Sequence, residues 1–125
     1  MDQIADLLIR IKNASMVQKF EVVTTFSKLK EAILNILKNE GFISNFEIEE
    51  VENKKFIKIS ISKTKTPTHL RQISKPGRRI YTKSKEIPAP LRGLGTVVIS
   101  TSTGVITGRE ATQKGLGGEL ICEIW

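Results

Sequence analysis

The segment from Ser27 to Gly41 constrains the fold more than any other part of the chain. Its apolar residues recur every three or four positions, as Leu29, Ala32, Ile33, Ile36 and Leu37. This spacing places them on one face of a helix. Serine is a common residue at helix N-termini, and glycine is common just past their C-termini. The sequence therefore predicts an amphipathic helix between these two residues.

A first helix and a strand are predicted on the N-terminal side of this segment. Asp2 is expected to cap a helix whose apolar face consists of Ile4, Leu7, Leu8 and Ile11. Residues 21–25 form a short run rich in β-branched side chains, which is typical of a strand. These elements and the amphipathic helix give the order helix, strand, helix.

A hairpin is predicted on the C-terminal side. Apolar residues alternate with polar and charged ones over residues 46–49 and 57–61, and Asn53 marks a turn between the two runs. The glutamates and lysines of the two strands are expected to face each other and to neutralise one another. Residues 1–62 are therefore expected to form an N-terminal unit with the order α-β-α-β-β.

The next segment, residues 63–70, lacks apolar periodicity and contains Pro67, so we expect a linker. His69 is the only histidine in the sequence and is expected to lie at the surface of this linker. Beyond it, Pro76 and Gly77 are predicted to form a type II turn between two short strands.

Residues 71–125 are predicted to form a mainly β unit with one short helix. Residues 96–100 have the composition of a buried strand. Thr107 and Glu110 have the spacing of a capping box, which begins a short helix that ends at Gly115. A terminal strand is expected to bury one face, formed by Leu120, Cys122 and Ile124. The fold class predicted for the whole chain is α+β.

Positive charge is concentrated in the second half of the sequence. Residues 1–62 contain nine basic and nine acidic residues, whereas residues 63–125 contain eleven basic and four acidic ones, which accounts for the whole net charge of +7. Residues 63–85 contain eight basic residues and no acidic one. Such a block can anchor a nucleic acid through counterion release, or it can be a solvated basic linker.

The residue types that catalysis and metal binding need are scarce. One histidine and one cysteine cannot form a histidine-based triad, a multi-ligand metal site or an internal disulfide. Gly115, Gly117 and Gly118 follow a predicted helix and precede a strand, the reverse of the order in nucleotide-binding loops. Cys122 is expected to be a buried structural thiol. We therefore expect no enzyme, no cofactor and no metal.

No apolar run approaches the roughly 20 residues that a membrane-spanning helix requires. The N-terminal residues do not resemble a secretion signal, because an acidic residue stands at position 2 and no basic leader precedes an apolar stretch. The single cysteine agrees with a reducing compartment. A soluble intracellular protein is therefore expected.

A cluster of hydroxyl side chains is the feature most suggestive of a binding surface. Ser100, Thr101, Ser102 and Thr103 are consecutive and precede Gly104. Hydroxyls both donate and accept hydrogen bonds, so they can contact base edges, ribose and phosphate, but they also commonly satisfy their own turn. The single tyrosine, Tyr81, follows a basic pair; its ring could stack on a base or pack in the core.

Several segments resemble one family closely. The stretches "ISKPGRRIY", "GLGTVVISTSTGVITGREA" and "GLGGELICEIW" resemble the C-terminal part of the bacterial-type small-subunit ribosomal protein eight family. The stretches "IADLLIRIKNA" and "FSKLKEAILNILKNEGFI" are similar to its two N-terminal helices. The segments occur in the right order, and the resemblance covers nearly the whole chain.

This resemblance implies a two-part α+β protein of the cytoplasmic ribosome, without catalytic activity. It implies direct binding to the central domain of small-subunit rRNA early in subunit assembly, mainly through the C-terminal part, beside neighbouring ribosomal proteins. Family members can also bind a site in their own messenger RNA, and the sequence leaves open whether this chain does so. No membrane contact and no obligate homo-oligomer are expected.

The resemblance also assigns residues. It implies an RNA-facing loop formed by Ser100, Thr101, Ser102, Thr103 and Gly104. It places Tyr81, Gly118 and Glu119 on the same surface, and it implies backbone contacts from Lys30 and Lys55. We expect the phosphate contacts that position the protein to come from Arg71, Lys75, Arg78 and Arg79.

The chain departs from the family pattern at two positions. Thr103 stands where many members have lysine, so one phosphate contact is expected to be absent. Gly108 replaces a frequent aspartate at the start of the short helix, although the Thr107 and Glu110 pair remains.

Two other functions are compatible with the residues. A nonspecific basic nucleic-acid-binding module would show a steep salt dependence and little sequence preference. A protein–protein adaptor would instead dock an acidic partner on its basic face and would ignore RNA at physiological salt.

Overall fold

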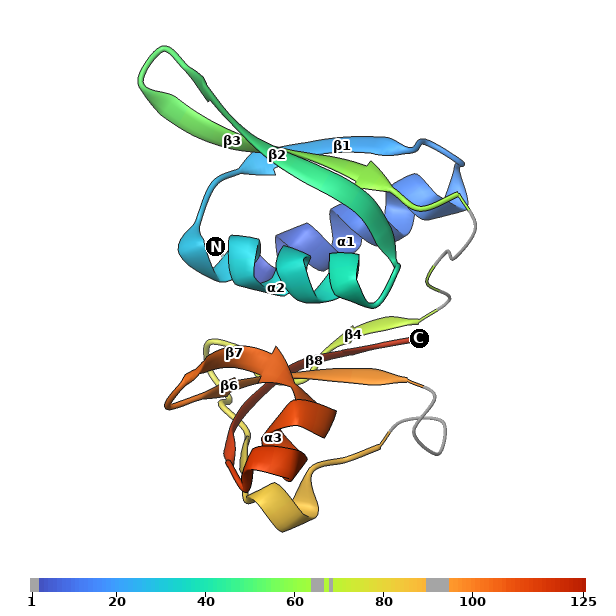
Figure 1. Cartoon of the computed structure of the whole chain (residues 1–125). Coiled ribbons are helices and arrows are strands. Elements are labelled where there is room, and N and C mark those ends of the chain that lie inside the picture. The colour runs from blue at the N-terminus through green and yellow to red at the C-terminus, as the bar shows by residue number, and fades with distance from the viewer. Residues whose placement is uncertain (1–2, 64–66, 68, 90–94) are drawn as a thin grey trace. The chain divides into compact units, whose positions relative to one another are not determined.

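The computed structural model of the chain describes residues 3–63, 67, 69–89 and 95–125 (Figure 1). The chain divides into two compact units, Gln3–Pro67 and Thr68–Trp125, and each is described by itself. Helices are combined with antiparallel sheets in both, so the predicted α+β class is confirmed. The predicted cap at Asp2 lies outside the described residues.

The N-terminal unit has the predicted order of elements. They are α1 (Gln3–Met16), β1 (Glu21–Thr25), α2 (Lys28–Asn39), β2 (Ile43–Val51) and β3 (Lys54–Ile61). The strands form an antiparallel sheet in the order β1-β3-β2, so β1 and β2 are its edges. Both helices lie on one face of this sheet (Figure 1).

The sequence signals for α2 are confirmed by its contacts. Ser27 caps the helix, because its hydroxyl accepts a hydrogen bond from the Lys30 amide at 3.1 Å. Gly41 has a φ of 86°, which suits the residue that follows a helix C-terminus. The apolar faces of the two helices are buried together with alternate residues of β3: Leu7, Leu8, Ile11, Ile33, Leu34, Leu37, Ile57, Ile59 and Ile61.

The end of α1 has no glycine. Gln18 adopts a left-handed conformation with a φ of 57°. The Lys19 amide donates to the Ala14 carbonyl at 2.8 Å, and the Gln18 amide donates to the Ser15 carbonyl at 3.3 Å. This pair of hydrogen bonds is a Schellman motif, which turns the chain sharply from α1 towards β1.

The β2–β3 hairpin turns at Glu52 and Asn53, which both have positive φ, of 52° and 65°. Glu47 lies opposite Lys58 in the strand register, as the alternation predicts. The Lys58 ammonium, however, forms its ion pair with Glu21 on the other neighbouring strand, at 3.5 Å. Charge neutralisation on this sheet therefore also runs between β3 and β1.

The C-terminal unit is mainly β, with one short α-helix. Its elements are β4 (Leu70–Gln72), β5 (Tyr81–Thr82), the 3-10 helix η1 (Ser84–Glu86), β6 (Thr96–Thr101), β7 (Gly104–Thr107), α3 (Gly108–Lys114) and β8 (Gly118–Ile124). The sheet has the order β4-β8-β6-β7, and β5 also pairs with β8. Strand β8 is therefore held by β6 on one side and by β4 and β5 on the other.

The capping signals of α3 are confirmed. The Thr107 hydroxyl accepts a hydrogen bond from the Glu110 amide at 3.2 Å, and Gly115 ends the helix with a φ of 67°. Ala111 packs on the core of this unit with Val97, Ile99 and Leu120. This core fixes one face of the sheet against α3.

The turn at Pro76 and Gly77 exists, but its predicted type is wrong. Lys75 and Arg78 exchange backbone hydrogen bonds across it, at 3.0 and 2.9 Å. Gly77 does not have the positive φ that a type II turn requires. The proline and glycine therefore mark the position of the turn without fixing its geometry.

Leu120, Cys122 and Ile124 of β8 are buried, as predicted, but the prediction that they share one face is wrong. Cys122 lies opposite Val98, but Leu120 lies opposite the next residue, Ile99, so Ile121 is an additional residue in β8. Such a β-bulge shifts the alternation of faces, and Leu120 and Cys122 therefore lie on opposite faces. Ile121 is itself buried.

Strand pairing begins inside the segment that was expected to be a linker. His69 exchanges backbone hydrogen bonds with Trp125, at 2.9 and 3.0 Å. Its ring stacks on the Trp125 indole with 3.8 Å between centroids, and its Nε2 lies 3.3 Å from Glu123 Oε1. The histidine therefore belongs to the sheet rather than to a free connection.

Candidate nucleic-acid interface

Three predicted site residues lie in one row across the C-terminal sheet. Glu119 of β8 is paired with Tyr81 of β5 on one side and with Ser100 of β6 on the other. Val105 of β7 continues the row beyond Ser100. Directly paired residues share a face of a sheet, and Leu120 and Ile99 face α3, so this row lies on the opposite face.

Tyr81 is the most exposed member of this row, since 71% of its surface is accessible. A core position, which the sequence left open for this residue, is therefore excluded. The pairing of β5 with β8 fixes the backbone of Tyr81, and its exposed ring can stack on a planar group.

The hydroxyl cluster forms the tip of the β6–β7 hairpin. Ser102 and Thr103 are the two turn residues, and Gly104 has a φ of 127°. The Thr101 hydroxyl donates to the Gly104 carbonyl at 2.8 Å and accepts from the Thr103 amide at 3.2 Å. Thr101 therefore satisfies its own turn, as one of the two interpretations of the cluster predicts.

The remaining serines of the cluster are differently placed. Ser102 is exposed and Ser100 is half-buried, and within the described residues neither hydroxyl forms a hydrogen bond. Thr103 is exposed and its hydroxyl lies 3.2 Å from that of Thr101. Two serine hydroxyls are therefore available to a ligand.

Two glycines bring the strands of this row into close contact. A Cβ atom on Gly118 would overlap the Ser100 carbonyl, and one on Gly117 would lie 2.5 Å from the Thr82 carbonyl. Gly118 therefore acts by close backbone approach, and Gly117 is a residue that the sequence analysis did not assign to the site. The double glycine before Glu119 is the sequence signal that could have identified it.

The Glu119 carboxylate is neutralised inside the site. Arg79 Nη1 lies 3.2 Å from Glu119 Oε2, and the side chains are 54% and 16% exposed. Sequence reasoning missed this pair, because forty positions separate its members and no local pattern connects them. The ion pair reduces the repulsion that the carboxylate would exert on a phosphate.

The other predicted basic residues divide into two groups. Lys75 and Arg78 are exposed on either side of the Pro76 turn and lead into Arg79. Arg71 lies on β4 and pairs with Glu123, its Nη1 3.4 Å from Oε1. Since Glu123 is four residues along β8 from Glu119, roughly 13 Å, Arg71 lies apart from the row.

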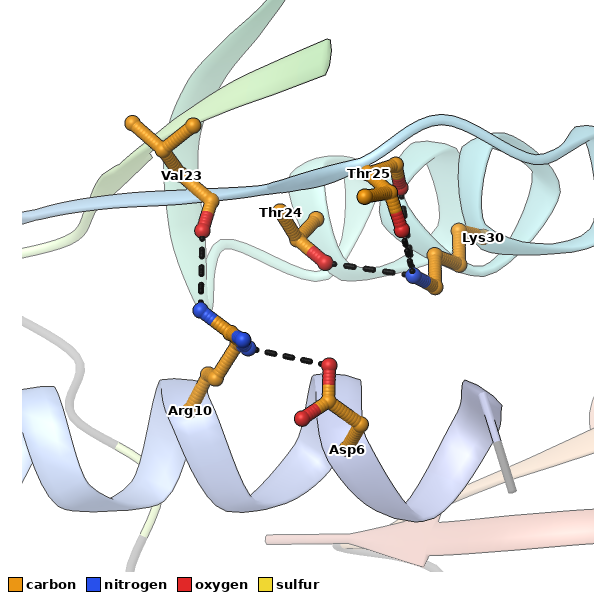
Figure 2. Close-up of polar contacts among 6 residues, drawn as sticks. All are labelled: Asp6, Arg10, Val23, Thr24, Thr25 and Lys30. Carbon is orange, nitrogen blue, oxygen red and sulfur yellow. Dashed lines mark hydrogen bonds and ion pairs between the residues drawn. The ribbon is translucent and has the colours of Figure 1, made fainter. Parts of the chain in front are cut away.

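Lys30 is not on an exposed surface. Figure 2 shows its ammonium directed at Thr24 and Thr25. Only 2% of the residue is accessible, and its ammonium donates to the Thr24 hydroxyl, the Thr25 carbonyl and the Thr25 hydroxyl at 3.2, 3.1 and 3.0 Å. Burial lowers the pKa of its amine from the ordinary value. This position does not suit the expected contact with an RNA backbone.

Lys55 is exposed on β3, and its ammonium lies 5.4 Å from the centroid of the Phe26 ring. A cation held over an aromatic face is attracted to the ring and has fewer accessible orientations. Lys55 thus remains available for contact with an anion, in the N-terminal unit.

Nothing in the described part of the chain suggests catalysis. The structure shows no group of three or more histidine, cysteine, aspartate or glutamate side chains suited to a metal ion among residues 3–63, 67, 69–89 and 95–125. Burial raises the pKa of the Cys122 thiol to about 12, which suppresses its reactivity and confirms a structural thiol. No helix among the described residues is long and apolar enough to span a membrane.

Comparison with known proteins identifies the family. A family model described as "Ribosomal protein S8" matches residues 2–125. The chain belongs to this family. A relative from Moorella thermoacetica, named "Small ribosomal subunit protein uS8", is 49% identical over 99% of this chain and 98% of its own length. A relative of the same name from Thermus thermophilus is 46% identical with the same coverage.

A third relative, "Small ribosomal subunit protein uS8c" from Tetradesmus obliquus, is 45% identical over 99% of this chain and 98% of its own length. The family resemblance found in the sequence is therefore confirmed over its full extent. Membership of the S8 family makes this chain a structural protein of the ribosome and not an enzyme.

The close approach at Gly118 leads to the first prediction. We expect Gly118→Ala to lower the free energy of unfolding by about 2 kcal/mol or more, because the new methyl group must push β6 and β8 apart. Gly77→Ala is the control, since no atom lies within 4 Å of the added Cβ, and its effect should stay within about 0.5 kcal/mol. Urea denaturation measures both; equal losses would contradict the prediction.

The buried ammonium of Lys30 leads to the second prediction. The pKa of the Lys30 amine in the folded chain lies below the ordinary value of 10.5, which applies to the unfolded chain. Between these two pKa values the unfolded chain binds more protons than the folded chain, so the stability that Lys30 contributes rises with pH. We therefore expect the unfolding free energy of the native chain, relative to Lys30→Met, to increase from neutral pH towards pH 10.5. Urea titrations across this range measure it, and parallel pH profiles for the two proteins would refute it.

Proposed function

We propose that this chain is a constituent of the small ribosomal subunit that binds the central domain of small-subunit rRNA directly and aids subunit assembly. The observation that carries the proposal is the row of Tyr81, Glu119 and Ser100, with the exposed hydroxyl of Ser102 beside it. The names of relatives that match the chain from end to end support the subunit assignment.

The chemistry of RNA explains why such a row suits this ligand. The major groove of A-form RNA is deep and narrow, so side chains reach the shallow minor groove or distorted, unpaired bases instead. Tyr81 offers a stacking face for a splayed base, and the hydroxyls of Ser100 and Ser102 offer donors and acceptors to base edges and ribose. We propose an irregular rRNA helix as the site.

The charged residues have two roles in this proposal. Lys75, Arg78 and Arg79 contact phosphates and set the position of the protein, which gives affinity without sequence preference. Glu119 accepts a hydrogen bond from an amino or hydroxyl group of the RNA and so contributes discrimination. Arg71 and Lys55 are outlying phosphate contacts, since neither lies in the row.

We further propose that the two parts of the chain have different roles. Residues 71–125 form the RNA-binding subdomain and residues 1–62 form a second subdomain, with 63–70 between them. The concentration of site residues on β5, β6 and β8 supports this division. Neighbouring ribosomal proteins, and a messenger RNA site resembling the rRNA target, are the further partners proposed.

The third prediction tests the hydroxyl contact. Ser102→Ala should weaken binding to a central-domain rRNA fragment about 2- to 10-fold, as expected for the loss of one hydrogen bond. The measurement is a binding titration at physiological salt with excess transfer RNA as competitor. Ser44→Ala, at an exposed serine of the N-terminal unit, is the control and should not change affinity. If excess transfer RNA displaces the native protein from the rRNA fragment, positive charge alone accounts for the binding.

The fourth prediction tests discrimination by the carboxylate. Glu119→Ala should lower affinity for the cognate fragment and leave affinity for random RNA unchanged or higher, because Arg79 loses its ion pair. Glu123→Ala is the control for the loss of charge. Glu123 is also a carboxylate of β8 that is paired with an arginine, but it lies outside the row. Binding titrations with the cognate fragment and with random RNA measure the two affinities. Equal losses of affinity for both RNAs would count against the proposal.

A further inference from the structure

A groove in the N-terminal unit is unrelated to the residues proposed to contact rRNA. It has a volume of about 600 Å³ and lies between the C-terminal part of α1 and β1. Its walls include Ala14 from α1, Val17 from the turn after α1, and Val22 and Val23 from β1, with charged side chains from Arg10 and Lys19. The sharp turn at Gln18 creates it by returning the chain directly from α1 into β1.

Apolar side chains at this groove are exposed to an unusual degree. Val17 is 71% accessible, and Met16, which precedes it, is 72% accessible. Val23 is 49% accessible, but it pairs with Lys58, so its side chain lies on the face of the sheet that the helices do not cover. Adjacent exposed apolar side chains such as Met16 and Val17, where polar residues border them, are characteristic of interaction sites. None of the described residues that line the groove is aromatic, so it offers no stacking face to a base.

The edge of β1 adds hydrogen-bonding groups to this surface. The Ile61 amide donates to the Phe20 carbonyl, and the Phe26 amide donates to the Lys55 carbonyl, in register with the β1–β3 pairing. The even-numbered residues of β1 therefore make the backbone hydrogen bonds to β3. The backbone groups of Glu21, Val23 and Thr25 point away from β3.

Two of these outward carbonyls already have partners (Figure 2). Arg10 donates to the Val23 carbonyl at 3.2 Å, and Lys30 donates to the Thr25 carbonyl at 3.1 Å. Among the described residues, the structure shows no partner for the Val23 amide or for the backbone amide and carbonyl of Glu21. The open part of the edge is thus the half that borders the groove.

The charge at the groove is positive. The Glu21 carboxylate is paired with Lys58, and Arg10 is paired with Asp6 through Nε at 2.9 Å. Lys19 is exposed, and its ammonium has no ion-pair partner within the described residues. A partner with carboxylates therefore complements this surface better than a basic one.

We propose that this groove binds a short extended segment of a protein partner that alternates apolar and acidic residues. The segment adds as a strand to β1, using the Glu21 carbonyl and the Val23 amide. Its apolar side chains lie beside Ala14 and Val17, and its carboxylates meet the positive charge of Lys19. The bond from Arg10 to the Val23 carbonyl limits the added strand to the first half of β1.

The experiment uses the full chain labelled with ¹⁵N and an acetylated, amidated seven-residue peptide of alternating valine and aspartate. We expect its addition to shift the amide resonances of residues 13–23 and to slow hydrogen exchange at Val23. A peptide of alternating valine and lysine should bind at least about tenfold more weakly. Two peptides of the same length and apolar content thus separate charge recognition from hydrophobic contact.

Variants locate the binding. Val17→Asp and Lys19→Glu should each weaken binding of the acidic peptide about tenfold or more, a loss of about 1.4 kcal/mol. Lys38→Glu makes the same charge change at an exposed lysine of α2 and should have no such effect. All three positions are exposed, so the variants are expected to fold.

Three outcomes would overturn the proposal: no binding of the acidic peptide at millimolar concentration, equal binding of the basic peptide, or shifts without slower exchange at Val23. Shifts of the same amides by the rRNA fragment alone would assign the groove to RNA instead. Ser102→Ala should bind the acidic peptide normally, so failure here is distinguishable from failure of the RNA proposal.

Discussion

The close packing of β8 between its neighbours is the constraint on which the C-terminal unit depends. One strand pairs with β6 along one edge and with β4 and β5 along the other, so three segments far apart in the sequence meet on it. The backbones approach too closely at Gly117 and Gly118 for any side chain. Because glycines stand at these two positions, the strands can pair closely enough to form the row of Tyr81, Glu119 and Ser100. The rigidity of the sheet then fixes the spacing between these residues.

The same arrangement separates the two kinds of contact that RNA recognition requires. Groups that read the ligand come from paired strands, where their positions are set by hydrogen bonds of the sheet. Groups that attract phosphate come from the exposed turn around Pro76, where exact position matters less because charge acts over distance. Arg79 links the two, since it lies in the basic segment and holds the Glu119 carboxylate.

Local signals in the sequence predicted the elements well. Ser27 and Thr107 cap their helices as expected, and the alternation around Asn53 gives the hairpin. Apart from the type of the turn at Pro76 and Gly77, the failures concern information that no short segment contains. The bulge in β8 depends on how it pairs with β6, and the burial of Lys30 depends on the position of β1. At the site, the residue types indicated a polar surface, but the Arg79–Glu119 ion pair exists only in the folded sheet.

Lysine and arginine serve different purposes in the two units. In the N-terminal unit, Lys30 and Arg10 donate to the outward carbonyls of an edge strand, which blocks part of that edge against pairing with other chains. The desolvation that lowers the pKa of the Lys30 amine shows that this protection has an energetic cost. Because the blocked part ends at Val23, the remaining backbone groups and the apolar groove beside them form one continuous surface. In the C-terminal unit, by contrast, Lys75 and Arg78 are exposed and can contact an anionic ligand.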